Sequence, residues 1–233
     1  MTRRMRLVLF DIDGTLVDCG PSVRRLFGSA MVETFGTAGP IDSYDFSGRT
    51  DDESVFALTA AAGLSLADVR DRLPLMKRLY LGRLERFLDP AEMRILPAVT
   101  GLLDDLAART DLCLGLLTGN WRDGARIKLA RVGLDGYFGF GAFGDDQPDR
   151  LGLPPVALAR AAAVTGRRWR MEECLIVGDS PADVACAHAH DIPALAVATG
   201  RTPAEVLAAA GPRWLVNDLV GQWSHPAFAP MTA

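Results

Sequence analysis

Four short, almost unbroken apolar runs constrain the fold of this chain more than any other feature of its sequence. They cover residues 7–10, 112–117, 174–177 and 194–198, and residues 215–216 add a candidate edge strand. Strands buried on both faces of a parallel sheet show this pattern, because neither face can carry polar side chains. Stretches with helical spacing separate the runs, within residues 102–106, 125–132 and 156–163. The alternation predicts a doubly wound, parallel-sheet (Rossmann-like) α/β core.

The long segment between the first and second runs breaks this alternation. Apolar residues recur there at helical spacing, without a convincing buried strand. We therefore predict an all-helical cap over residues 17–96, inserted into a core formed by residues 1–16 and 97–233. Near the end of the chain, Thr202-Pro203-Ala204-Glu205 predicts a capping box with proline in the first helical position, and hence a helix over residues 203–210.

Composition argues against several kinds of partner. Lys and Arg total 25 against 29 Asp and Glu, without a long run of one sign, so neither nucleic acid nor an anionic membrane surface is expected. The apolar stretch near the start of the chain, residues 7–10, is too short for a signal-peptide core, and no later stretch approaches the length of a membrane span. The cysteines form no CxxC pair, and two lie in apolar runs, which indicates reduced thiols and a cytoplasmic location. We expect a small molecule as the partner, and the oligomeric state stays open.

Two carboxylates follow the first apolar run, in Asp11-Ile12-Asp13-Gly14-Thr15. Open α/β sheets bind ligands at the carboxyl ends of their strands, so this position favours a functional site. The alternative is a plain turn, since Asp-Gly is a common turn signal.

The second run ends in Thr118-Gly119-Asn120, which also opens the next helix. A hydroxyl and free backbone N–H groups at this position can hold phosphate oxygens. Asn120 could equally be a simple helix cap.

The third run ends in Gly178-Asp179-Ser180-Pro181-Ala182-Asp183. Ser180, Pro181 and Asp183 all suit the start of a helix, but this interpretation leaves Asp179 unexplained. Asp179 and Asp11, at neighbouring strand ends, would supply hard oxygen ligands of the kind that bind Mg²⁺.

In order and position, these three segments closely resemble the motifs of the haloacid dehalogenase superfamily: DxDGT, then Ser or Thr after the second core strand, then GDxxxD. Residues 118–138 are similar to the branch of phosphoglycolate-phosphatase-like proteins, whose helical cap follows the first motif. The resemblance covers nearly the whole chain. It implies a Mg²⁺-dependent phosphatase that hydrolyses a small phosphorylated metabolite, a phosphomonoester, through an aspartyl-phosphate.

The resemblance also implies roles for the residues of the first two motifs. Asp11 is the expected nucleophile and a metal ligand. Asp13 is the expected general acid and base, and its backbone carbonyl is an expected metal ligand. Thr118 is expected to donate a hydrogen bond to the phosphoryl group, with Gly119 and Asn120 binding substrate beside it.

For the last motif, the resemblance implies that Asp179 binds the metal. Asp183 would support the metal through water or a neighbouring ligand, unless it only caps its helix. The family also has a lysine or arginine shortly before this motif, often in a Lys-Pro dipeptide, which this sequence lacks. Arg150 is our choice for that phosphate-stabilising cation, with Lys128 and Arg160 as alternatives.

Within the expected cap, residues 46–51 are similar to the turn that family members use to read the leaving group of the substrate. Arg49 is expected to bind a substrate carboxylate or a second phosphate, because its planar guanidinium suits both groups. An exposed arginine beside a helix cap is the alternative.

Three other functions remain open at this stage. A carbon–halogen hydrolase of the same superfamily needs no metal, and Asp13, Gly14 and Asp179 disfavour it. A phosphomutase shares the motifs and differs chiefly in its cap. A noncatalytic binding module could retain the fold, although the intact acidic residues argue against it.

Overall fold

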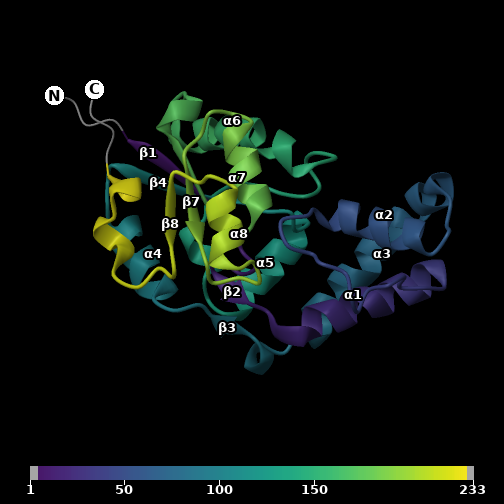
Figure 1. Ribbon diagram of the computed structural model, residues 1–233. Coiled ribbons are helices and arrows are strands. Elements are labelled where there is room, and N and C mark those ends of the chain that lie inside the picture. The colour runs from purple at the N-terminus through teal and green to yellow at the C-terminus, as the bar shows by residue number, and fades with distance from the viewer. Residues whose placement is uncertain (1–4, 230–233) are drawn as a thin grey trace.

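The apolar runs form a six-stranded parallel sheet in the computed structural model, which describes residues 5–229 (Figure 1). All four predicted strands are present, and residues 215–216 lie in an edge strand. The predicted α/β fold class is confirmed. The strands follow the order β5 (Gly141–Ala142), β4 (Leu112–Leu117), β1 (Arg6–Phe10), β6 (Cys174–Gly178), β7 (Ala194–Val197) and β8 (Trp214–Val216).

The strands are added to the sheet on opposite sides of β1. From β1 it first adds β4 and β5 on one side, and then β6, β7 and β8 on the other. Phe10, the last residue of β1, is in register with Leu116 of β4 and Val177 of β6. The polar segments that follow these three strands therefore meet at one edge, where open α/β sheets form their ligand crevice.

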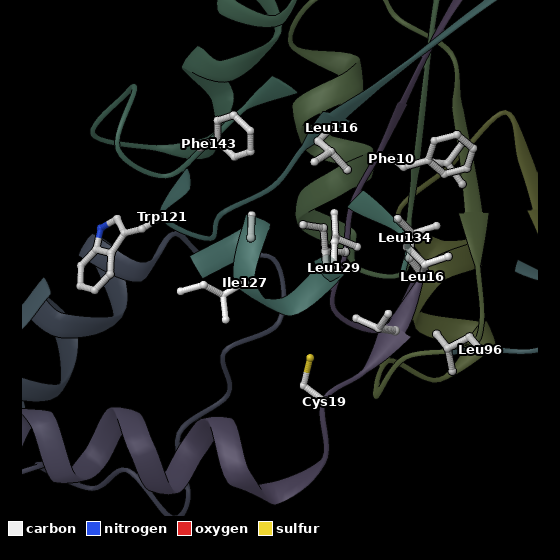
Figure 2. Packing of buried hydrophobic residues seen from close by; sticks show 14 of the residues in the cluster. Phe10, Leu16, Cys19, Leu96, Leu116, Trp121, Ile127, Leu129, Leu134 and Phe143 are labelled. Atoms are coloured by element: carbon white, nitrogen blue, oxygen red, sulfur yellow. The ribbon is translucent and has the colours of Figure 1, made fainter. Parts of the chain in front are cut away.

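Helices cover both faces of the sheet because successive side chains of each strand point in opposite directions. Val8 and Phe10 of β1 belong to one hydrophobic cluster, together with side chains of α4 (Val99–Ala107) and α5 (Arg122–Arg131). Figure 2 shows Phe10 and Leu116 in this cluster, near Leu129 of α5. Leu7 and Leu9 belong to the cluster on the other face, under α6 (Leu153–Thr165), α7 (Pro181–His188) and α8 (Ala204–Ala209).

Three helices form most of the inserted segment: α1 (Gly20–Phe35), α2 (Asp51–Ala61) and α3 (Leu66–Phe87). They lie together on one side of the molecule in Figure 1, and their apolar side chains continue the cluster that contains Val8 and Phe10. The insert is not wholly helical, since β2 (Val17–Asp18) pairs antiparallel with β3 (Arg94–Ile95) where it meets the core. The division into cap and core at residues 17 and 96 stays a prediction.

Two local predictions differ from the structure. The helix near the C-terminus is present, but the capping box at Thr202 is wrong. Pro203 is the N-cap, because its extended backbone (ψ 146°) presents a carbonyl that accepts from the N–H groups of Val206 and Leu207. Strand β5 was not predicted, since a Gly-Ala pair has little intrinsic strand propensity and only its pairing with β4 makes it a strand.

The remaining elements are short. They are 3₁₀ helices at Pro90–Glu92, Asp135–Tyr137, Arg150–Gly152, Met171–Glu173, Gln222–Ser224 and Pro226–Phe228. None of the helices within residues 5–229 is both long enough and apolar enough to cross a membrane.

Candidate active site

The loop after β1 is a tight turn built around a carboxylate of another strand. Gly14 has φ +85°, and a Cβ at this position would lie 2.3 Å from Oδ2 of Asp179. The hydroxyl of Thr15 donates to Oδ1 of Asp179 over 2.9 Å. Asp11 is 5% exposed, and its N–H donates to the carbonyl of Val177 over 2.9 Å. The Asp-Gly segment does form the turn that its sequence suggests, and this turn packs against Asp179, so that Asp11 and Asp179 lie close together.

Three buried carboxylates gather at this point. Asp11, Asp179 and Asp183 each offer an oxygen atom, and these atoms lie within 4.8 Å of one another. Burial raises the pKa of Asp11 to about 6, although Arg150 opposes the shift. Burial, together with the charges of Asp11 and Asp183, raises the pKa of Asp179 well above its ordinary value. This concentration of hard, negatively charged oxygen atoms suits a divalent cation such as Mg²⁺.

Arg150 supplies positive charge to the same cluster. Its Nη2 lies 3.4 Å from Oδ1 of Asp11, pairs with Oδ1 of Asp183, and donates to the carbonyl of Leu117. The other carboxylate oxygen of Asp183 accepts from the N–H and the hydroxyl of Ser180 at 3.0 and 2.6 Å. Asp183 therefore takes part in the capping box of α7 and also pairs with Arg150, whereas its expected support of the metal stays a prediction.

The two alternatives to Arg150 occupy different positions. Arg160 pairs with Asp146 and donates to the carbonyl of Gly141 over 2.7 Å, and it is absent from the lining of the central cavity in the described chain. Lys128 does reach the site, but its Nζ lies 2.7 Å from Oδ2 of Asp13. Of the three predicted cations, only Arg150 pairs with Asp11.

Asn120 links the loop after β4 to the loop after β1. Its amide nitrogen donates to Oδ2 of Asp13 over 2.7 Å and to Oγ1 of Thr118 over 2.8 Å. Burial alone would raise the pKa of Asp13, but Lys128, Asn120 and Cys19 outweigh it and lower that pKa. Burial likewise disfavours the charged form of Lys128, yet Asp13 and other neighbours raise its pKa well above its ordinary value. Asp13 and Lys128 are thus an ion pair.

A cavity of about 420 Å³ opens over these groups. It is lined by the loops after the strands, by the loop before α2 and by side chains of α1 and α3. Arg49 lies exposed at this cavity, with its guanidinium 5.5 Å from the centre of the Tyr44 ring. The structure thus brings together most of the predicted site residues in one lining: Asp11, Asp13, Arg49, Thr118, Gly119, Asn120, Lys128, Arg150 and Asp179.

Asp51 at the start of α2 was not among the predicted site residues. Its N–H donates to the carbonyl of Gly119 over 2.9 Å, and its Oδ2 accepts from the N–H of Trp121 over 2.8 Å. The approach is so close that a Cβ on Gly119 would lie 2.0 Å from the carbonyl oxygen of Arg49. Burial raises the pKa of Asp51 to about 7. Asp51 lies within the predicted substrate-reading turn, but the sequence gives no sign of this contact, since the partner loop is 70 residues away.

A family model described as haloacid dehalogenase-like hydrolase matches residues 5–191. The doubly wound α/β fold, with an acidic site at the carboxyl ends of its strands, agrees with this match. With this match, the chain belongs to the haloacid dehalogenase-like hydrolases, and the resemblance inferred from its motifs is confirmed.

Curated relatives of this chain are named phosphoglycolate phosphatase, and two of them are at least 30% identical to it. The protein from Synechococcus elongatus is 32% identical over 218 residues, which cover 91% of this chain and 93% of the relative. The protein from Rhodospirillum rubrum is 30% identical over 224 residues, which cover 94% of this chain and 90% of the relative. The predicted likeness to the phosphoglycolate-phosphatase-like branch is therefore confirmed.

Solved structures show the same fold at low sequence identity. A protein described as a predicted phosphatase from Clostridium acetobutylicum has a TM-score of 0.71 at 17% identity, with 95% of this chain and 97% of that chain covered. CbbY from Rhodobacter sphaeroides, solved in complex with phosphate, has a TM-score of 0.65 at 17% identity, with 94% and 96% covered. At such identities the likeness establishes the fold alone.

Proposed function

We propose that this hydrolase is a Mg²⁺-dependent phosphatase that cleaves a small phosphomonoester through an aspartyl-phosphate on Asp11. The observation that carries the proposal is the setting of Asp11, which lies at the cavity between the guanidinium of Arg150 and the carboxylate of Asp179. The names of the curated relatives support the enzyme class. They also favour transfer of the phosphoryl group to water over the phosphomutase alternative.

The chemistry requires strong stabilisation of negative charge, because phosphate monoesters are among the slowest substrates to hydrolyse, with accelerations of up to about 10²¹-fold known. An oxygen of Asp11 forms a bond to phosphorus as the bond to the leaving alkoxide breaks. Arg150 and the hydroxyl of Thr118 would stabilise the phosphoryl oxygens in this step. A Mg²⁺ ion held by Asp11, Asp179 and the backbone carbonyl of Asp13 would add Lewis-acid stabilisation of the same oxygens.

Asp13 would transfer the protons in both halves of the reaction. Its lowered pKa means that it is ionised at neutral pH in this structure, which suits it to deprotonate the water that hydrolyses the aspartyl-phosphate. To protonate the alkoxide in the first half, it must first gain a proton when the substrate brings further negative charge into the cavity. Its side chain is 41% exposed and is therefore accessible to both leaving group and water.

Phosphate release from a panel of phosphorylated metabolites, with and without Mg²⁺, tests the proposed function. In this assay we expect Asp179→Asn to raise the Mg²⁺ concentration needed for half-maximal activity by at least about 10- to 100-fold, the loss that follows when a residue supporting a metal ligand is changed. The reason is that the variant loses a hard anionic ligand. An unchanged Mg²⁺ dependence would remove Asp179 from the metal site, and absence of turnover across the panel would count against a phosphatase.

Arg49 is expected to govern substrate choice more than the chemical step. It lies in the loop before α2, at the cavity. Within the described residues, Arg49 forms no ion pair with Asp11, whose ion-pair partner is Arg150. We expect Arg49→Ala to lower kcat/KM by about 10- to 100-fold for substrates with a carboxylate or second phosphate, which a guanidinium can bind through two hydrogen bonds. p-Nitrophenyl phosphate lacks such a group and should lose less than about 3-fold. An equal loss on both kinds of substrate would contradict this role.

A further inference from the structure

Lys128 is a buried cation that the proposed mechanism leaves without a function. Its side chain is 4% exposed and extends from α5 to the loop after β4. The Nζ atom lies 2.7 Å from Oδ2 of Asp13 and 2.6 Å from Oδ1 of Asn120. Lys128 thus contacts the expected proton-transfer residue and a neighbour of the expected phosphoryl donor, rather than Asp11.

The ammonium group determines which way the amide of Asn120 faces. A lysine ammonium is only a donor, so the atom of Asn120 that faces it must be the carbonyl oxygen Oδ1. The amide nitrogen Nδ2 is then turned toward Asp13 and Thr118, and it donates to both. Both of its hydrogen atoms are used in these contacts.

This orientation has a consequence for the hydroxyl of Thr118. Since Oγ1 accepts a hydrogen bond from Asn120, the hydroxyl proton must point away from Asn120. Thr118 also lines the cavity above Asp11, where a phosphoryl oxygen would accept that proton. With the amide reversed, Asn120 would offer its oxygen instead, and Thr118 would donate to Asn120 rather than to the substrate.

We propose that Lys128 is a positioning residue that holds the amide of Asn120 so that Thr118 remains a hydrogen-bond donor to the phosphoryl group. The negative charge of Asp13 also disfavours the reversed amide, because two oxygen atoms would then face each other. Lys128 maintains the orientation throughout the cycle, since its ammonium contacts Oδ1 directly.

A double-mutant cycle tests the inference, which rests on the proposed aspartyl-phosphate mechanism. The rate of phosphoenzyme formation from p-nitrophenyl phosphate would be measured by rapid quench for wild type, Lys128→Met, Thr118→Val and the double variant. We expect Thr118→Val to lower the rate by about 10²-fold, as for loss of one donor to a developing charge. Lys128→Met should lower it by at least about 10-fold, and the double variant should lie within about 3-fold of the slower single variant, because both changes remove the same hydrogen bond. Losses that multiply would overturn the proposal and indicate that Lys128 acts on the phosphoryl group by itself.

The matched control is Arg126→Met, which removes a cation from an exposed position of the same helix. It should keep the wild-type rate, so that a loss in Lys128→Met cannot be assigned to the altered charge of α5. Circular dichroism and thermal unfolding would verify that each variant is folded. A folded Lys128→Met protein with the wild-type rate would also overturn the proposal.

A readout independent of activity comes from the two lysines of the chain, Lys77 and Lys128. The side chain of Lys77 is 32% exposed, so its ammonium protons should exchange quickly with water, whereas those of Lys128 should exchange slowly. We expect one persistent ¹⁵N ammonium signal that disappears in Lys128→Met and shifts in Asn120→Ala. If that signal were insensitive to Asn120→Ala, the contact on which the inference depends would be absent in solution. If the signal behaved as expected but no phosphoenzyme formed in wild type, the proposed mechanism would fail and not the contact.

Discussion

Asp11→Asn is expected to abolish the trapped phosphoenzyme and to lower turnover by at least about 10⁴-fold, the scale seen when an enzyme loses its nucleophile. An amide oxygen is a far weaker nucleophile than a carboxylate oxygen. The substitution also removes one of the three carboxylates of the site. Covalent phosphate would be measured by rapid quench with radiolabelled substrate. An acid-stable, hydroxylamine-sensitive phosphoenzyme in this variant would show that the nucleophile is another residue, with Asp13 as the leading candidate.

Asp13→Asn provides the contrast, because Asp13 is expected only to move protons. A poor alkoxide leaving group must be protonated as it departs, whereas a stabilised phenolate can leave unaided. The variant should therefore lose most of its activity on alkyl phosphates and retain relatively more phosphoenzyme formation from aryl phosphates. Equal losses on both kinds of ester would contradict the acid role.

Arg150→Met is expected to have the second largest effect, a fall in kcat of about 10²- to 10³-fold, because it removes the guanidinium that pairs with Asp11. It should also lower the free energy of unfolding by about 3–5 kcal/mol in metal-free buffer at pH 8, since Asp11 and Asp183 would be left as buried anions without their cation. Arg150 lowers the pKa of Asp11, which is about 6 in its presence, so this pKa should be higher in the variant. The loss of stability should therefore shrink as the pH falls from that higher pKa toward about 6, because protonation removes the unpaired charge. Denaturant unfolding at pH 8 and pH 5 measures this difference.

Two controls make the Arg150 experiment specific. Arg150→Lys keeps the charge and should recover most of the stability, while losing the hydrogen bonds that the planar guanidinium makes. Arg160→Met removes the alternative arginine, whose partner Asp146 lies outside the cavity lining in the described structure, and should leave kcat within about 2-fold. A large effect of Arg160→Met on kcat together with a small effect of Arg150→Met would reverse the assignment.

The sheet could be predicted from the sequence because its signal is local. A strand buried on both faces must be apolar at every position, as residues 112–117 are, and this composition is visible without knowledge of its neighbours. The Asp-x-Asp-Gly-Thr turn and the Ser180 cap are local in the same sense, since each is defined by residues a few positions apart. By contrast, β5 is a strand only because β4 lies beside it.

The tertiary structure decided which side chains act on one another. Asp13, Asn120 and Lys128 are separated by up to 115 residues, and no pattern of spacing indicates that Lys128 pairs with Asp13 while Arg150 reaches Asp11. The contact of Asp51 with the loop at Gly119 likewise exists only because the fold brings the start of α2 beside the loop after β4. Ion pairs and hydrogen bonds act over a few ångströms in space, so their partners are set by the packing of the sheet and helices. The sequence by itself determined which chemical groups stand at the strand ends, and the fold determined how they are paired.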